Sequence, residues 1–190
     1  AIAYREILAE RYGKKKQTIS GIHFNFSFSD AFIDALYKKQ DKFETKIAFQ
    51  NDLYVKLAGN FLKYEWILLY LFGASPYAEP DFFDSKSGRL LKIPTDYVRS
   101  LRNSSFGYHN HDEVIVNYES VETYVEDIEN YVETRHLSEE REFYGNARLR
   151  GKGSRLREML DSGVQYIEFR SFDVNPLDRL GVSHEQGEFY

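Results

Sequence analysis

Apolar and polar positions alternate over residues 17–28, and this period of two is typical of a β-strand. One face of the predicted strand carries the apolar residues Ile22, Phe24, Phe26 and Phe28. The opposite face is mostly polar, and Gly21 leaves space beside the imidazole of His23. The residues predicted on this face are Gln17, Ile19, Gly21, His23, Asn25 and Ser27. A strand of this kind belongs to a sheet that is packed on one side and can hold a site on the other.

A second alternating segment, residues 164–176, predicts another such strand. Ile167 and Phe169 point to one face, and the opposite face carries Tyr166, Glu168, Arg170 and Phe172. A carboxylate and a guanidinium two residues apart on one face suit a divalent cation beside a phosphate group. A cross-strand ion pair on a solvated sheet face is the commoner origin of such a pair, and both interpretations stay open here.

Elsewhere apolar residues recur every three or four positions, which predicts helices. The predicted helices are residues 1–12, closed by Gly13; a segment capped by Ser29 or Asp30 that runs to about Gln40; residues 51–72; a helix capped by Ser120; and a short helix capped by Ser154 that ends near Gly163. Residues 113–118 can form a further strand, and 73–89 form a loop. Since no strict strand–helix–strand rhythm is present, the predicted fold class is α+β with a largely antiparallel sheet.

Composition narrows the class of protein. The chain has 190 residues, enough for one domain with a real core, and is rich in aromatic residues, with 15 Tyr and 15 Phe. A net charge of −5 gives no general attraction to nucleic acid. The absence of cysteine excludes disulfides and thiolate metal sites and fits a cytoplasmic protein. The most apolar segment, residues 66–74, is too short to span a membrane.

His23 and Glu168 are the candidate metal ligands, because imidazole and carboxylate can share one divalent cation. Magnesium prefers oxygen, so a histidine ligand would also admit manganese. A lone histidine in a strand is more often a hydrogen-bonded structural residue, and the residues alone do not decide between these roles.

A basic stretch follows the acidic helix that Ser120 caps; its members are Arg141, Arg148, Arg150, Lys152, Arg155 and Arg157. These side chains can contact nucleotide phosphates, or they can form a solvated surface balanced by the acidic helix. The sequence GKGS at 151–154 lacks the spacing of a phosphate-binding loop, and HNH at 109–111 does not match the nuclease of that name. Common acyl-transfer templates are missing, since there is no cysteine and no Gly-x-Ser-x-Gly.

Four segments together resemble glutamate–cysteine ligase of the bacterial type: QTISGIHFNFSF (17–28), LFGASP (71–76), SLRNSSFGY (100–108) and YIEFRSFDVNP (166–176). The amino-acid sequence of residues 51–80 resembles that of the two-domain enzymes that fuse this ligase to a glutathione synthetase. The resemblance implies a glutamine-synthetase-like carboxylate–amine ligase fold with a curved sheet and helices on one face. It implies ligation of the γ-carboxylate of glutamate to the amine of cysteine through a γ-glutamyl phosphate, with ATP as co-substrate and Mg²⁺ at the phosphates.

The resemblance also implies residue roles. His23 and Glu168 correspond to metal ligands, Arg170 lies beside the transferred phosphoryl group, and Arg102 lies at the γ-carboxylate and phosphate. Arg148 is a candidate nucleotide contact. The residues expected to line the amino-acid pockets are Tyr4, Arg5, Leu8, Gln17, Ile19, Tyr108 and Tyr144, with the tyrosines around the cysteine side chain.

The family's further metal-binding carboxylates come from a segment that would precede residue 1. We therefore expect residues 1–190 to be an internal fragment of one catalytic domain and to be inactive alone. The expected partners are glutamate, cysteine and ATP, with neither nucleic acid nor a membrane, and with a glutathione synthetase domain in the parent protein. Two alternatives are a ligase that joins glutamate to a different amine and a non-catalytic binding domain.

Overall fold

The computed structural model describes residues 2–83 and 94–189. The chain divides into two compact units. The first unit comprises Ala1–Ile22, Glu65–Asn110 and Ser171–Tyr190, and the second comprises His23–Tyr64 and His111–Arg170. The predicted α+β class is confirmed, because helices accompany a small sheet with antiparallel pairing.

Three strands form the sheet in the described part of the chain, in the order β1-β3-β2. They are β1 (Gly21–Phe26), β2 (Ala147–Gly151) and β3 (Val164–Asp173). Strands β2 and β3 are antiparallel, with Arg148 opposite Glu168 and Leu149 opposite Ile167. The register shifts between Arg150 and Gly151, which is the irregularity of a β-bulge. The central strand is therefore the one that carries Glu168.

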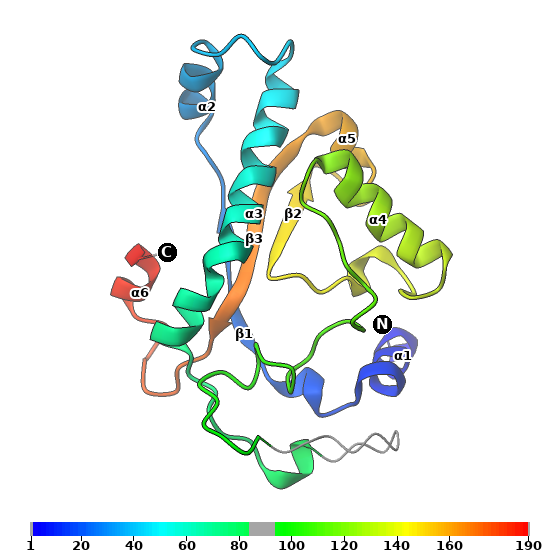
Figure 1. Ribbon diagram of the computed structural model, residues 1–190, viewed down its shortest axis with the longest axis vertical. Helices are drawn as coiled ribbons and strands as arrows, with labels where there is room; N and C mark the ends of the chain where they lie inside the picture. Colours follow the sequence, from blue (N-terminus) through cyan, green and yellow to red (C-terminus); the bar gives the residue numbers. More distant parts are fainter. Residues whose placement is uncertain (1, 84–93, 190) are drawn as a thin grey trace. The chain divides into compact units, whose positions relative to one another are not determined.

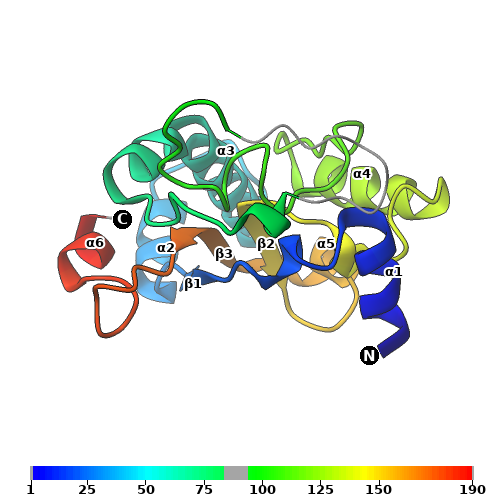
Figure 2. The ribbon, with the colours of Figure 1, turned by 90° about the horizontal axis from the view of Figure 1, so that it is seen from below.

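Helix α3 (Lys46–Phe72) runs alongside β3 and lies across one face of the strands (Figures 1 and 2). Within the second unit, Asn51 Oδ1 accepts a hydrogen bond from the Val164 N–H at 2.8 Å. The Tyr54 hydroxyl donates to the Gln165 carbonyl at 3.0 Å, and the Phe61 and Phe169 rings lie 4.4 Å apart. This helix therefore covers the apolar face of β3 and fixes the backbone where the strand begins.

Helix α4 (Val121–Glu133) begins at the predicted cap. Ser120 accepts from the Thr123 N–H while the Thr123 side chain accepts from the Ser120 N–H, which is a complete capping box. Four residues of its apolar stripe are buried: Val121, Tyr124, Val125 and Ile128. The Tyr124 ring packs against Tyr118 and Phe143, and burial raises the pKa of Tyr124 to about 12.

Two short helices complete the second unit. Helix α2 (Asp30–Tyr37) begins where predicted, because Ser29 accepts from the Phe32 N–H. Helix α5 (Glu158–Ser162) ends at Gly163, whose φ of 74° favours glycine. The prediction that Ser154 caps this helix is wrong: the residue before the helix is Arg157, with no side-chain cap. The Ser154 N–H instead donates to the Glu158 carboxylate.

The first unit holds the ends of the chain. Helix α1 (Ile2–Tyr12) is closed, as predicted, by Gly13, whose N–H donates to the Ala9 carbonyl and whose φ is 90°. Helix α6 (His184–Phe189) packs the Phe189 ring against Phe72 at the end of α3. Short 3₁₀ turns occupy Lys16–Thr18 and Pro80–Phe82 here, and Glu140–Glu142 in the second unit. Residues 84–89 of the predicted loop lie outside the described residues.

Two predicted strands differ from the structure. The first begins at Gly21 rather than residue 17, because Lys16–Thr18 form a 3₁₀ turn in which the Thr18 N–H donates to the Lys15 carbonyl. Residues 113–118 form no strand, because side chains of α4 take their hydrogen bonds: the Ile115 N–H donates to the Tyr131 hydroxyl, and the Asn117 N–H donates to Asp127. Side chains of α4 therefore accept the backbone hydrogen bonds that a neighbouring strand would otherwise accept.

No helix in the described part of the chain combines the length and the apolar character that crossing a bilayer requires.

We expect Ser120→Ala to lower the free energy of unfolding by about 1 kcal/mol, because it removes the acceptor for the Thr123 N–H. Ser154→Ala is the matched control and should change stability little, since the Ser154 side chain caps nothing. Urea unfolding of both variants measures the difference. Equal losses would contradict the capping role of Ser120.

Candidate active site

The candidate site of the second unit is built around the carboxylate of Glu168 in the middle of β3. His23 Nδ1, from β1, donates to Oε1 at 2.8 Å. Arg150, from β2, donates to Oε2 through Nε at 2.9 Å and Nη2 at 2.6 Å, and Arg170 Nη2 donates to the same oxygen at 3.1 Å. One carboxylate therefore joins side chains from all three strands.

The predicted alternation places these side chains correctly in the second unit. His23 meets Glu168, whereas the Phe26 ring lies 6.5 Å from Phe169 on the apolar side. Ile167 and Phe169 are buried, as the alternation of β3 predicts. The sheet thus separates a packed apolar face from a polar face that carries titratable groups.

Three donors hold Glu168 in its charged form. Its side chain is 12% exposed, and burial alone would raise the pKa of the carboxyl. Hydrogen bonds from His23, Arg150 and Arg170, together with the charge of Arg170, outweigh burial and hold the pKa of Glu168 far below its usual range. The carboxylate is therefore available as an anionic ligand at neutral pH.

Arg170 is placed by an aromatic ring as well as by Glu168. Its guanidinium lies 5.6 Å from the centre of the Tyr144 ring, within cation–π range. Only 10% of the Arg170 side chain is exposed. Tyr144, expected at an amino-acid pocket, therefore adjoins the arginine expected at the phosphoryl group.

Arg148 lies opposite Glu168 in the β2–β3 register, yet its contacts are different. Its guanidinium donates to the backbone carbonyls of Glu140, Arg141 and Phe143 at 3.2–3.3 Å. It is buried, and burial lowers its pKa. These contacts show Arg148 fixing the turn at residues 140–143.

His23 and Glu168 fit part of the coordination shell of a divalent cation. Adjacent ligands of an octahedral cation with bonds of about 2.0–2.1 Å lie roughly 2.9 Å apart. The 2.8 Å between His23 Nδ1 and Glu168 Oε1 is close to that separation, and a bound cation would take the place of the Nδ1 proton that now lies between them. Among the described residues, no group of three or more His, Cys, Asp or Glu side chains can hold a metal ion. The pair is therefore an incomplete ligand set.

A cavity of about 410 Å³ lies further along the same strands and is lined by Asn25, Ser27, Gln165 and Tyr166. Asn25 and Tyr166 lie two residues from His23 and Glu168, so by strand alternation they belong to the same face. The Asn25, Ser27 and Tyr166 side chains form no hydrogen bond within the described part of the chain. This cavity has an uncharged lining and can accept polar groups of a ligand.

Arg102 organises a separate polar cluster in the first unit. Its side chain is buried, and Nη1 donates to the Phe172 carbonyl at 3.2 Å and lies 3.8 Å from Asp173 Oδ1. Asp173 also accepts from the Ala74 N–H at 2.9 Å and from Asn103 Nδ2 at 3.1 Å. These contacts tie the segments SLRNSSFGY and LFGASP to the end of β3.

Gly21 gives Arg102 its space. A Cβ at Gly21 would lie 2.1 Å from Arg102 Cζ and 2.3 Å from Nη2. The sequence interpretation, in which this glycine makes room beside His23, therefore missed its closest neighbour.

The other expected pocket residues also lie in the first unit. Tyr4, Arg5 and Leu8 belong to α1, where Leu8 is buried and Arg5 is exposed. The Tyr108 ring packs edge-on against Tyr12 at 5.1 Å. Gln17 lies in a 3₁₀ turn and Ile19 follows it, so the prediction that both share a strand face with His23 is wrong.

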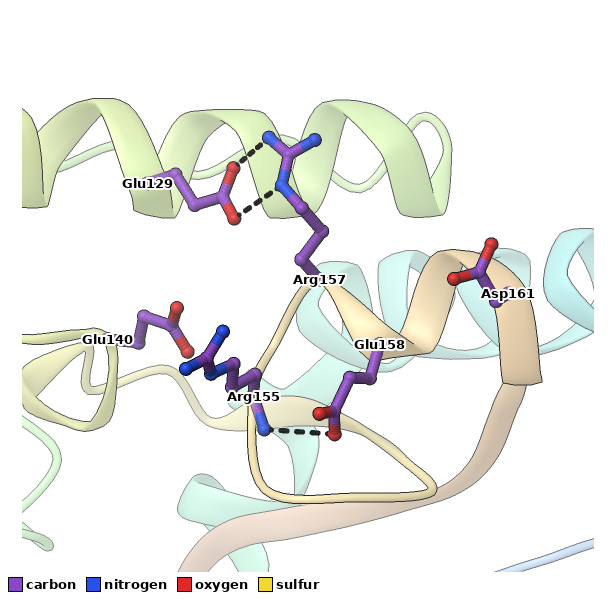
Figure 3. A pocket seen from close by; sticks show the side chains of 6 residues that line it. All are labelled: Glu129, Glu140, Arg155, Arg157, Glu158 and Asp161. Atoms are coloured by element: carbon purple, nitrogen blue, oxygen red, sulfur yellow. Dashed lines mark hydrogen bonds and ion pairs between the residues drawn. The ribbon is translucent and has the colours of Figure 1, made fainter.

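A second cavity, of about 460 Å³, lies among Glu129, Glu140, Arg155, Arg157, Glu158 and Asp161 (Figure 3). Arg157 donates to both carboxylate oxygens of Glu129 on α4. The Glu158 and Glu140 carboxylates accept backbone N–H groups of Arg155 and Leu156. Arg157 is thus balanced by the acidic helix, as one of the two interpretations of the basic stretch predicts.

Arg150 is the site residue that the sequence did not single out. The sequence pattern presents it only as one member of the basic stretch and predicts no strand over residues 147–151. The alternation of Arg148 and Arg150 around Leu149 was the available signal.

Known proteins resemble the chain along its whole length. The family model described as glutamate-cysteine ligase matches residues 1–138 and 129–190. The chain belongs to the glutamate–cysteine ligase family. The "Glutathione biosynthesis bifunctional protein GshAB" of Pasteurella multocida is 48% identical over 99% of this ligase-family chain, and that of Enterococcus faecalis is 46% identical over 100%. The chain spans about a quarter of the length of these relatives, 24% in both cases.

Solved structures resemble this ligase-family chain as well. The crystal structure of a bifunctional glutathione synthetase from Pasteurella multocida has a TM-score of 0.87 and 46% identity, covering 99% of this chain and 24% of its own. A glutamate–cysteine ligase from Francisella tularensis in complex with AMP has a TM-score of 0.73 and 28% identity, covering 96% of this chain and 42% of its own. The family resemblance inferred from the four segments is confirmed.

The depressed pKa of Glu168 makes its contribution to stability pH-dependent. A carboxyl with a lowered folded-state pKa stabilises the fold above its unfolded pKa of about 4.3, and that contribution is lost as the pH falls further. We expect Glu168→Gln to cost about 2 kcal/mol at pH 7. The gap from wild type should narrow below about pH 4.3. Denaturant unfolding between pH 7 and 3 tests this, and a constant gap would contradict it.

We expect Gly21→Ala to destabilise the protein by about 1–3 kcal/mol, because the added methyl group overlaps the buried Arg102 guanidinium. Gly59→Ala is the control: it lies inside α3, and the nearest atoms to its new methyl group are 3.9 Å away. That change should stabilise the helix by up to about 1 kcal/mol. Opposite signs in urea unfolding are expected, and destabilisation by both would count against the role of Gly21.

Proposed function

We propose that the full-length protein containing this chain is an ATP-dependent glutamate–cysteine ligase. It joins the γ-carboxylate of L-glutamate to the amine of L-cysteine and releases ADP and phosphate, the first step of glutathione biosynthesis. The observation that carries the proposal is the Glu168 cluster, which brings His23, the proposed second cation ligand, and two arginines to one carboxylate in a chain of this family. Phosphoryl transfer depends on positioning and charge neutralisation of this kind.

In this proposal His23 and Glu168 are two of the ligands of Mg²⁺, with Mn²⁺ as an alternative. The ion would supply charge neutralisation at the ATP phosphates. Arg170, already placed by Glu168 and the Tyr144 ring, would face the phosphoryl group as it moves to the γ-carboxylate. Its fixed positive charge would stabilise the charge that develops there.

The cavity beside Asn25 and Tyr166 is the proposed place for the nucleoside part of ATP. A nucleotide has an anionic end and a neutral aromatic end, and this face of β1 and β3 has a charged cluster followed by an uncharged cavity. The Tyr166 ring offers a stacking surface, and Asn25 and Ser27 offer hydrogen-bonding groups.

Arg102 and residues expected at the amino-acid pockets are the proposed glutamate and cysteine contacts. Arg102 would bind the γ-carboxylate and phosphate through its guanidinium, which the Phe172 carbonyl and Asp173 hold in place. The residues proposed to line the amino-acid pockets are Tyr4, Arg5, Leu8, Gln17, Ile19, Tyr108 and Tyr144. Arg148 remains the proposed nucleotide contact, although its N–H groups also donate to carbonyls of residues 140–143.

The parent protein and its setting are part of the proposal. We assign the chain to one portion of a single catalytic domain, because it spans a quarter of the length of its relatives. The glutamine-synthetase-like ligase fold is proposed for that domain because the family resemblance implies it. Fusion to a glutathione synthetase domain is proposed from the bifunctional relatives, and a cytoplasmic location from the zero cysteines. Residues 1–190 alone are expected to be inactive, because the described ligand set is incomplete.

The test is ADP release by the full-length protein, with cysteine added or withheld. Glu168→Gln should lower cysteine-dependent release by at least about 100-fold, and Arg170→Lys should also lose most activity because a point charge does not replace a planar fork. Arg157→Lys, a change at an exposed ion pair, is the control and should retain activity. Near-normal turnover by Glu168→Gln would refute the role of Glu168.

The same assay separates the alternatives. A ligase with a different acceptor would release ADP faster with another amine than with cysteine. A binding domain would release no ADP with any amine and would show no dependence on divalent cations. Family membership favours the ligase with cysteine as acceptor.

A further inference from the structure

The two oxygens of Glu168 have different partners. Oε1 faces only His23 among the contacts described, whereas Oε2 receives both donors of the Arg150 fork and one from Arg170. A carboxylate on a flexible side chain can rotate its two oxygens into each other's places. Three N–H groups on one oxygen oppose that rotation and leave the other directed at the imidazole.

Of the two arginines that donate to Glu168 Oε2, Arg150 makes the stronger contact and Arg170 the weaker one. It places two N–H groups on Oε2, at 2.9 and 2.6 Å, and it comes from the neighbouring strand β2. Arg170 places one N–H there at 3.1 Å and is also drawn to the Tyr144 ring. Arg148, directly opposite Glu168, cannot substitute for Arg150 because its guanidinium serves three backbone carbonyls.

We infer that Arg150 is a positioning residue for Glu168: its fork fixes Oε2, so that Oε1 and His23 Nδ1 together face one divalent cation. The inference rests on the proposed function for the identity of the cation pair. It assigns Arg150 no contact with a substrate. Partners that fix a ligating carboxylate typically change metal affinity 10–100-fold when they are removed.

The decisive variant is Arg150→Lys, which keeps the positive charge and loses the two-donor fork. Mn²⁺ alone, with neither ATP nor amino acids, is titrated into the full-length protein, and free Mn²⁺ is followed by its electron paramagnetic resonance signal. We expect Arg150→Lys to bind Mn²⁺ about 10–100-fold more weakly than wild type. Unchanged affinity would overturn the inference.

Arg157→Lys is the matched control. Arg157 makes the same kind of fork, through Nε and Nη2, onto the carboxylate of Glu129. Its replacement should leave Mn²⁺ affinity unchanged. An equal loss from Arg157→Lys would show a general effect of losing an ion pair and would overturn the specific role of Arg150.

A double variant separates positioning from a purely structural role. In a Glu168→Gln background, Arg150→Lys should cause no further loss of Mn²⁺ affinity, because the carboxylate that it positions is gone. A further loss of the same size would overturn the inference.

Arg150→Gln provides the second single variant. Positioning predicts weaker Mn²⁺ binding, whereas simple charge repulsion between Arg150 and the cation predicts tighter binding, which would overturn the inference. These measurements do not involve ligation, so a failed ligase assay with intact Mn²⁺ coupling would reject the proposed function alone. Absence of Mn²⁺ binding by the wild-type protein would overturn the positioning inference.

Discussion

The polar face of the sheet depends on one shared carboxylate. Glu168 lies on the central strand and receives donors from β1, β2 and β3, so its charge stabilises three cationic or imidazole side chains at once. A carboxylate this buried would be costly without those donors. Because the three partners come from different strands, the arrangement exists only when the sheet is formed. Folding and the assembly of the candidate site are therefore one event in this unit.

Neighbouring arginines on β2 show that register alone does not assign a role. Arg148 and Arg150 are two residues apart and share a face, but Arg148 supports backbone carbonyls of a turn while Arg150 binds Glu168. The difference comes from the acceptors that each guanidinium reaches: three backbone carbonyls for Arg148 and the Glu168 carboxylate for Arg150. The carbonyls of the turn at residues 140–143 are within reach of Arg148, and the Glu140 carbonyl also accepts from the Phe143 N–H.

Strand alternation was enough to predict the faces of His23 and Glu168, because apolar partners such as Phe26 and Phe169 impose a clear period of two. Alternation did not predict the strand at residues 147–151, because two of its positions are arginines. It wrongly predicted a strand at residues 113–118, where backbone N–H groups donate to side chains of α4 and not to a neighbouring strand. Both failures concern tertiary partners, which local pattern does not contain. Arg150 was missed for the same reason.

The bulge between Arg150 and Gly151 has a consequence for how this family can vary. A Cβ at Gly151 would lie 2.7 Å from Met159 Cβ, so α5 holds the end of β2 in place directly after the arginine. The pairing has shifted register there, with Gly151 opposite Val164. Insertions or deletions in the exposed turn at residues 152–155 would therefore not shift the pairing of Arg150 with Glu168. The connection can change in length over evolution while the arginine stays in register with the carboxylate.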